Sequence, residues 1–163
     1  MVPGRNFLQL ETQNGTITPM ETTTTTQYVK CAYAFREKGY NCAQAVACSF
    51  ADVVGIDEKN LFIMSEAFGG GMGGHKATCG AVSGAVLIIS LLTSGGSVEA
   101  ATKQTSYNYA GEIVDGFLEQ NGTLVCSELR GDESGIVLRT CDLCVEDAVV
   151  LLHKLLQKNG KHF

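Results

Sequence analysis

The sequence predicts an all-α protein, a compact bundle of about five or six helices with a glycine-rich loop and a cysteine-bearing loop. Apolar residues recur at helical spacing in several segments, and helix-start and helix-stop residues bracket those segments. No stretch of strict apolar–polar alternation is long enough to predict a strand. The 163 residues, 45% of them hydrophobic, are enough for one domain with a sizeable core.

The first part of the chain differs in composition from the rest. Residues 1–26 are polar, contain both prolines and include five consecutive threonines, so we expect a disordered leader. This segment has no apolar run typical of an export signal. Residues 27–163 are expected to form a single helical domain in the cytoplasm. In that compartment clustered cysteines more often serve metal or redox chemistry than structural disulfides.

Two helices are predicted before residue 56. The first begins at Gln27, with apolar residues at i, i+3, i+4 and i+7 from Tyr28, and ends at Gly39. The second follows Asn41, a favoured N-cap residue, and ends at Gly55.

Four more N-cap residues mark the later helix starts, namely Asp57, Thr78, Ser97 and Thr140. The matching stop signals are the glycine cluster at 69–74, Gly95 and Gly96, Asn121 and Gly122, and Asn159 and Gly160. The apolar run at 80–92 is shorter than the roughly 18–20 residues that span a bilayer, so it predicts a buried helix and no membrane role. The last helix has a clear apolar stripe. Residues 123–139 have no helical period and are expected to form an ordered loop.

Three of the seven cysteines directly follow a predicted N-cap residue: Cys42, Cys79 and Cys141. A helix N-terminus presents unpaired N–H groups and partial positive charge, which favours a thiolate and lowers the cysteine pKa. A thiolate is the form that binds metal or attacks a disulfide. Cys126, in the predicted loop, is the fourth candidate, because a loop can bring a ligand to a site formed by helix ends.

The other three cysteines have different interpretations. Cys31 lies within an apolar stripe, and free cysteine is among the most buried residue types. Cys48 lies about 600° around an ideal helix from Cys42, so it is also expected to pack in the core. Three interpretations stay open for Cys144, the second cysteine of a C-x-x-C pair: an additional ligand, a resolving thiol or a core residue.

The glycine cluster has two interpretations, a flexible joint or a backbone segment that approaches a cofactor and donates N–H groups to it. It matches G-x-G-x-x-G, but it follows a predicted helix rather than a strand, which argues against nucleotide binding. The cofactor-proximal candidates are Gly70, Gly71, Gly73, Gly74 and Gly80. His75 is a candidate ligand or proton donor, with an exposed loop residue as the alternative.

The cysteine-bearing segments together resemble the C_GCAxxG_C_C family of redox-active proteins. The segments are NCAQAV, FGGGMGGHKATCGAVSG, CSELRG and CDLCVEDAVVLL. The family's C-G-A-x-x-G motif is matched by Cys79, Gly80, Ala81 and Gly84, and its other three cysteines by Cys42, Cys126 and Cys141. The resemblance covers roughly residues 27–156. It implies a small helical protein with a redox role, often associated with transport or oxidoreductase systems.

The same family resembles part of the split-Soret cytochromes, which carry an iron–sulfur centre besides haem. This chain has Val145 after its C-x-x-C pair, where c-type haem attachment needs a histidine. Only the iron–sulfur centre therefore carries over from that resemblance.

Four function classes remain open. The first is an electron carrier in which Cys42, Cys79, Cys126 and Cys141 hold one iron–sulfur cluster, most simply 2Fe–2S. The second is a metal-free thiol–disulfide or sensor protein, pairing Cys141 with Cys144 or Cys79 with Cys126. The third is a structural zinc module with a closed four-cysteine site, and the fourth is a helical interaction protein with its cysteines in the core. The first two rank above the last two.

The expected partners follow from charge and composition. A net charge of −5 disfavours nucleic acid and anionic membrane surfaces. A redox function implies a partner protein that gives or takes electrons, and the Gly- and Ala-rich helices leave a homodimer open. The sequence contains no Ser/His/Asp signature and no carboxylate pair with a recognisable catalytic role. No catalytic residue is therefore assigned.

Overall fold

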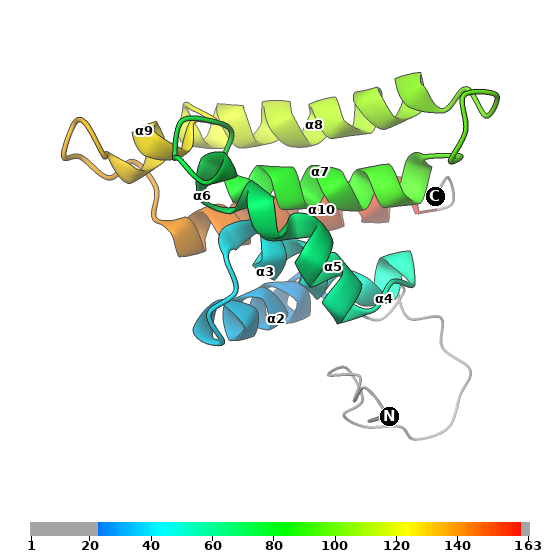
Figure 1. The fold of residues 1–163 in the computed structure, drawn as a ribbon, viewed down its shortest axis with the longest axis horizontal. Coiled ribbons are helices and arrows are strands. Elements are labelled where there is room, and N and C mark those ends of the chain that lie inside the picture. The colour runs from blue at the N-terminus through cyan, green and yellow to red at the C-terminus, as the bar shows by residue number, and fades with distance from the viewer. Residues whose placement is uncertain (1–22, 161–163) are drawn as a thin grey trace.

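Helices form nearly all of the regular structure in the computed structural model, which describes residues 23–160 (Figure 1). Within that range the helices of eight or more residues are α2 (Thr25–Glu37), α3 (Cys42–Ser49), α5 (Glu58–Ser65), α7 (Gly80–Thr93), α8 (Lys103–Asn121) and α10 (Cys141–Asn159). The shorter ones are α4 (Ala51–Val54), the 3₁₀ helix η1 (Glu66–Phe68), α6 (Gly69–Met72) and α9 (Cys126–Arg130). The predicted all-α class is confirmed. The predicted leader lies outside the described residues, apart from its last four.

Polar caps define the start of the first two long helices. Thr24 and Asn41 each form a capping box. The side chain of the cap residue accepts from the backbone N–H of a glutamine three residues on, and the side chain of that glutamine accepts from the backbone N–H of the cap residue. The first helix therefore begins slightly earlier than predicted. The predicted single helix up to Gly55 is divided into α3 and α4, because the backbone of Phe50 leaves the helical region.

The buried helix α7 packs most extensively on α3. A Cβ on Gly84 would lie 2.6 Å from the carbonyl oxygen of Ala43, so glycine lets the two backbones approach closely. The N-cap of α7 is Cys79 rather than the predicted Thr78. Thr78 instead pairs with Val125 in an isolated antiparallel bridge, which takes it out of the capping position.

The second half of the chain differs from the sequence prediction in two places. The predicted loop at 123–139 contains α9, so Cys126 lies at the start of a short helix. Helix α8 begins at Lys103, later than the predicted start after Ser97. Ala101 has a left-handed φ of 55°, which a continuous helix excludes. The last helix begins as predicted, with the side chain of Thr140 accepting a backbone N–H.

Helix α10 is central to the core and contacts α2, α3, α7 and α8. The predicted apolar stripe on α10 is buried; its members are Val145, Ala148, Val149, Leu152, Leu155 and Leu156. Figure 1 shows α7 and α8 running side by side above α3 and α2. Within residues 23–160, none of the helices combines the length and apolar character that a membrane crossing requires.

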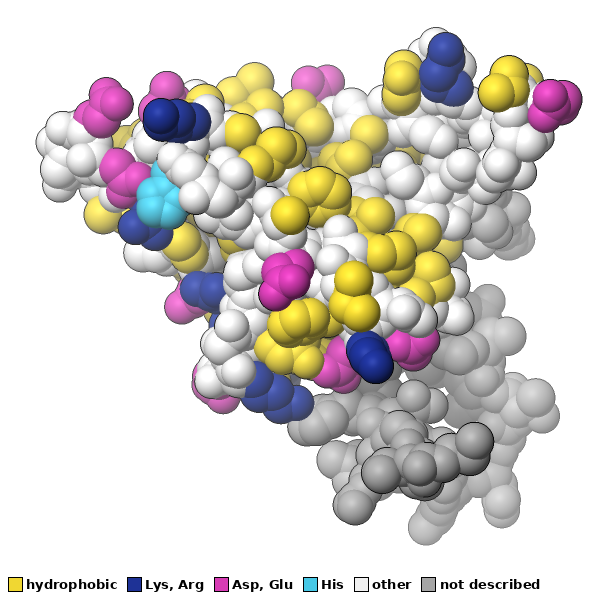
Figure 2. Space-filling model, in the orientation of Figure 1, with side chains coloured by type: hydrophobic (Ala, Val, Ile, Leu, Met, Phe, Trp, Pro, Cys, Tyr) yellow, Lys and Arg dark blue, Asp and Glu magenta, His cyan; other side chains and the backbone are white. Residues whose placement is uncertain are grey.

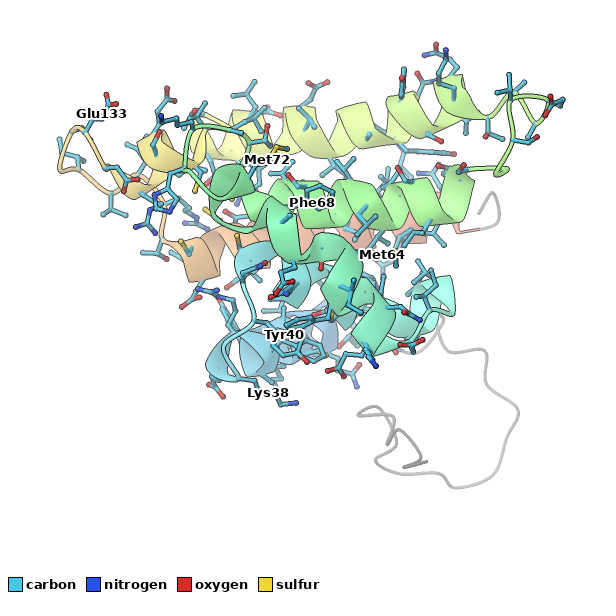
Figure 3. The ribbon with its side chains drawn as sticks, viewed as in Figure 1. Lys38, Tyr40, Met64, Phe68, Met72 and Glu133 are labelled. Carbon is cyan, nitrogen blue, oxygen red and sulfur yellow. The ribbon has the colours of Figure 1, made fainter. Side chains whose placement is uncertain are left out.

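Apolar side chains also gather on the surface over α5, η1 and α6 (Figure 2). Ile63, Met64 and Met72 are large and exposed there. Figure 3 shows Met64, Phe68 and Met72 following one another along these elements. This face is one on which a second copy could pack, and the homodimer stays a prediction.

Candidate functional site

The four cysteines singled out by the sequence line one cavity of about 180 Å³. They are Cys42, Cys79, Cys126 and Cys141, and they share the wall with Arg36, Asn41, Gly70 and Arg130. Each cysteine lies at the N-terminal end of a different helix, α3, α7, α9 or α10. These helix ends gather at the left of the bundle in Figure 1.

Backbone hydrogen bonds hold two of these helix starts together. The N–H of Cys79 donates to the carbonyl oxygen of Leu124 at 2.7 Å, and the N–H of Cys126 donates to that of Ala77 at 3.0 Å. These bonds flank the Thr78 bridge described above. The start of α7 is therefore fixed beside the start of α9, although the two are far apart in the sequence.

Three of the predicted cofactor-proximal glycines make room for the thiols. A Cβ on Gly80 would lie 2.5 Å from the sulfur of Cys42, and one on Gly71 would lie 2.6 Å from the Cβ of Cys126. Gly70 lines the cavity with a left-handed φ of 59°. The glycine segment is therefore packed directly against the cysteines, rather than serving only as a joint.

The end of the glycine segment lies away from the cavity wall. Gly73 and Gly74 are exposed, and an ideal Cβ on either would meet no atom within 4 Å. His75 lies beside Gly70, but its Nδ1 is 2.7 Å from a carboxylate oxygen of Asp132. The structure does not bring these three predicted residues into contact with the thiols.

Arg130 places a positive charge at the mouth of the cavity. Its Nη1 donates to the Cys141 sulfur at 3.6 Å, and its Nε donates to Asp132 at 3.1 Å. Asp132 thus joins Arg130 to His75 in one surface network. One of the four cavity sulfurs therefore lies against a guanidinium group.

Arg36 is the second arginine of the wall. Its Nε donates to Asp142 at 2.8 Å, which joins α2 to the start of α10. The sequence analysis missed both arginines. Arg130 follows Cys126 by four residues and so shares a helix face with it, which is a usable signal once α9 is recognised. Arg36 reaches the cavity through the packing of α2 on α10, for which the sequence carries no local signal.

Burial and mutual contact keep three of the cavity thiols protonated at neutral pH. The pKa of Cys42 is raised, first by its hydrogen bond with Cys79 and then by burial. The pKa of Cys79 is raised to about 12, first by its hydrogen bond with Cys144, and burial raises that of Cys126 to about 11. The predicted lowering of the cysteine pKa at the starts of α3 and α7 is therefore wrong, because exclusion of water and neighbouring thiols outweigh the helix dipole.

The remaining cysteines lie outside the cavity wall. Cys31 is half-buried against the core, and Cys48 is buried with its thiol 3.6 Å from the carbonyl oxygen of Glu58, so both pack as predicted. Cys144 is 1% exposed, and its thiol lies 4.0 Å from the carbonyl oxygen of Arg139. All seven cysteines are free thiols.

Within the described residues, 23–160, no three His, Cys, Asp or Glu side chains are grouped so that they could hold a metal ion. Four thiols around one cavity are nonetheless the donor set that binds iron–sulfur clusters, in which each iron of a 2Fe–2S cluster takes two cysteines. The chemistry of the donor set therefore fits such a cluster.

Comparison with known proteins gives one match. A family model described as "Putative redox-active protein (C_GCAxxG_C_C)" matches residues 40–155. No curated protein and no solved structure matches the chain. The matched range contains the whole of the cavity wall apart from Arg36.

Proposed function

This chain belongs to the C_GCAxxG_C_C family of redox-active proteins, and from that premise we propose that its four cavity cysteines hold an iron–sulfur cluster for electron transfer. The ligands are Cys42, Cys79, Cys126 and Cys141, and the simplest cluster for four thiolates is 2Fe–2S. When bound, such a cluster accepts and releases single electrons. The observation that carries the proposal is the convergence of these four thiols on one cavity.

The surroundings of the cavity suit an anionic cluster. The N-terminal ends of α3 and α10 direct partial positive charge toward it. Arg36 and Arg130 add two guanidinium groups to the cavity wall. Charges and hydrogen bonds of this kind tune the reduction potential of a cluster.

The high pKa values favour a metal-binding role over a metal-free thiol sensor. A sensor needs thiolates at neutral pH, whereas Cys79 and Cys126 have pKa values of about 12 and 11. A bound metal removes those protons because its affinity for thiolate exceeds that of the proton. The redox-partner protein is then expected to dock where Arg130 and Cys141 leave the cavity open to solvent.

The test is anaerobic purification followed by a visible spectrum and assays for iron, zinc and acid-labile sulfide. We expect a brown protein with iron and sulfide in equal amounts. Replacing the four ligands by alanine should abolish both, while the matched double variant Cys31→Ala, Cys48→Ala should keep them. A colourless protein, tightly held zinc without sulfide, or unchanged iron in the fourfold variant would contradict the proposal.

A further inference from the structure

An exposed apolar segment lies in the loop between α9 and α10, at the left end of the molecule in Figure 1. Its members, Ile136, Val137 and Leu138, are consecutive in the chain and are 67%, 57% and 58% exposed. Leu143, on the first turn of α10, adds a side chain that is 36% exposed. Large apolar side chains that gather on a surface mark an interaction site, whereas isolated ones need no explanation.

Hydrogen bonds fix the base of this loop. The backbone N–H groups of Leu138 and Arg139 both donate to the carbonyl oxygen of Leu129, at 2.9 and 3.0 Å. The guanidinium of Arg139 also donates to both carboxylate oxygens of Asp147, at 2.8 Å each. An anchored loop presents the apolar segment in a defined position, which lowers the entropy lost when a partner binds.

Negative charge accompanies the apolar segment. Residues 126–147 contain six acidic residues and two arginines, a formal charge of −4, while the whole chain carries −5. Both arginines of this stretch form ion pairs with carboxylates of the same stretch. Glu133 extends from the loop into solvent (Figure 3). Nearly all of the net charge of the protein therefore lies in the stretch that contains the apolar segment.

We propose that the apolar segment and the carboxylates beside it form the docking surface for the redox partner, and that this partner is an electron-transfer protein with a basic contact face around an apolar patch. The inference rests on the proposed function in taking a redox partner as the occupant. An apolar centre with a polar rim is the ordinary anatomy of a specific interface. Docking here places the partner beside Cys141, which lines the cavity two residues after Arg139.

The charge of this surface disfavours two other occupants. In a two-fold dimer through the apolar segment, each copy would present its acidic rim to the acidic rim of the other, and like charges would repel. The headgroups of an anionic bilayer would be repelled in the same way. A basic partner satisfies both the apolar segment and the carboxylates, and opposite charges on the two rims would steer their encounter.

The experiment measures the binding of cytochrome c, a lysine-rich redox protein, to the full-length protein by isothermal titration calorimetry. We expect binding at low salt that weakens about tenfold or more when the salt is raised to about 0.2 M, because salt screens exposed charges. A plant-type ferredoxin, which is an acidic redox protein, is the matched probe and should not bind.

Serine variants test the apolar segment. The triple variant I136S, V137S, L138S should weaken cytochrome c binding about tenfold or more, because the centre of an interface carries most of the binding energy. The matched control replaces three exposed apolar residues on α5 and α6 and should bind like the parent: I63S, M64S and M72S. Circular dichroism checks that both variants keep their helices.

Charge reversal tests the acidic rim, and it serves alone if the triple loop variant does not fold. E133K should weaken cytochrome c binding about threefold or more through repulsion of like charges. E99K makes the same change in the exposed loop between α7 and α8, at the other end of the bundle, and should bind like the parent (Figure 1).

Several results would overturn the inference: no binding of cytochrome c, equal binding of the ferredoxin, or parental binding in the folded loop variants. Sedimentation velocity tests for a second copy, and pelleting with vesicles of phosphatidylcholine and phosphatidylglycerol tests for a membrane. If the parent forms a dimer or binds these vesicles, and the triple loop variant loses that association, the surface has a different occupant and the inference fails.

Iron and acid-labile sulfide assays on the same samples separate this inference from the proposed function. If cytochrome c binds through the loop and the protein holds no iron or sulfide, the cluster proposal fails and the docking surface stands. If the protein holds iron and sulfide and the loop variants bind cytochrome c like the parent, the docking surface alone fails.

Discussion

At the scale of single residues, two glycines set how closely α3 approaches α7. Gly80 leaves space for the sulfur of Cys42, and Gly84 leaves space for the backbone of Ala43. The small residues of the C-G-A-x-x-G motif therefore serve packing against the first cysteine-bearing helix. They affect the site through the distance between two helices.

The packing role of Gly84 predicts an unusual response to alanine. In a helix interior, Gly→Ala normally stabilises by about 0.5–1 kcal/mol. G84A should instead lower the free energy of unfolding by about 1–3 kcal/mol, because the new Cβ would lie 2.6 Å from a carbonyl oxygen. G111A in α8 is the matched control, since a Cβ there meets nothing within 4 Å, and it should stabilise. Urea unfolding measures both variants, and a stable G84A would contradict the packing role.

His153 is the residue whose burial predicts a pH dependence of stability. It is fully buried, its Nδ1 lies 2.8 Å from the hydroxyl of Thr25, and its ring centroid lies 4.9 Å from that of Tyr28. Burial lowers its pKa below the ordinary value of 6.5. Below that pH the unfolded chain binds a proton that the folded chain refuses, so stability falls as the pH falls.

The measurement is the free energy of unfolding between pH 7.5 and 5.5. The parent should lose stability across this range, and H153Q should lose less. Burial raises the pKa of Asp52 above its ordinary value of 3.8, so the contribution of Asp52 to stability falls as the pH rises. D52N removes this contribution and so separates it from that of His153. An unchanged slope in H153Q would exclude His153 as the cause.

At the scale of elements, Asn41 joins a helix cap to the cavity wall. Its side chain accepts from the N–H of Gln44 to cap α3, and its Nδ2 donates to the carbonyl oxygen of Glu66 at 2.9 Å. N41A should cost about 2 kcal/mol, from about 1 for the cap and about 1 for the second bond. T140A is the matched control, because the side chain of Thr140 caps α10 through the N–H of Leu143, and it should cost about 1 kcal/mol. Equal losses in urea unfolding would show that the bond to Glu66 contributes nothing.

Local sequence patterns predict the long helices well, because their caps act within four residues. Asn41, Asp57 and Thr140 begin helices as the sequence indicates. The prediction of Thr78 as an N-cap and of Cys126 in a loop is wrong, because a backbone bridge between distant segments determines the local structure at both residues. Local rules carry no information about such long-range pairing.

In the candidate site, too, some features have a local sequence signal and others depend on long-range packing. Helix-start signals bring out Cys42, Cys79 and Cys141, whereas Cys126 is a candidate from its place in a predicted loop. The arginines of the wall depend on how the helices pack. The pKa direction of the thiols also depends on burial, which a helix-dipole argument from sequence leaves out.

At the scale of the whole molecule, the fold divides the seven thiols by access. Only Cys31 and Cys141 are half-buried, and the other five are buried. Cys31 lies on α2 outside the cavity, and burial raises its pKa. The buried thiols react only when the fold opens, so their rates follow the free energy of that opening. Iodoacetamide should therefore label Cys141 first and Cys31 second in the reduced, chelator-treated protein.

Cluster loading should change this order at one position and so identify the fourth ligand. A thiolate bound to iron is withdrawn from alkylation, so Cys141 should become protected while Cys31 keeps its rate as an internal control. Timed labelling followed by peptide mass spectrometry measures both rates in the same sample. If Cys141 keeps its rate in protein with full iron and sulfide, Cys141 is not a ligand.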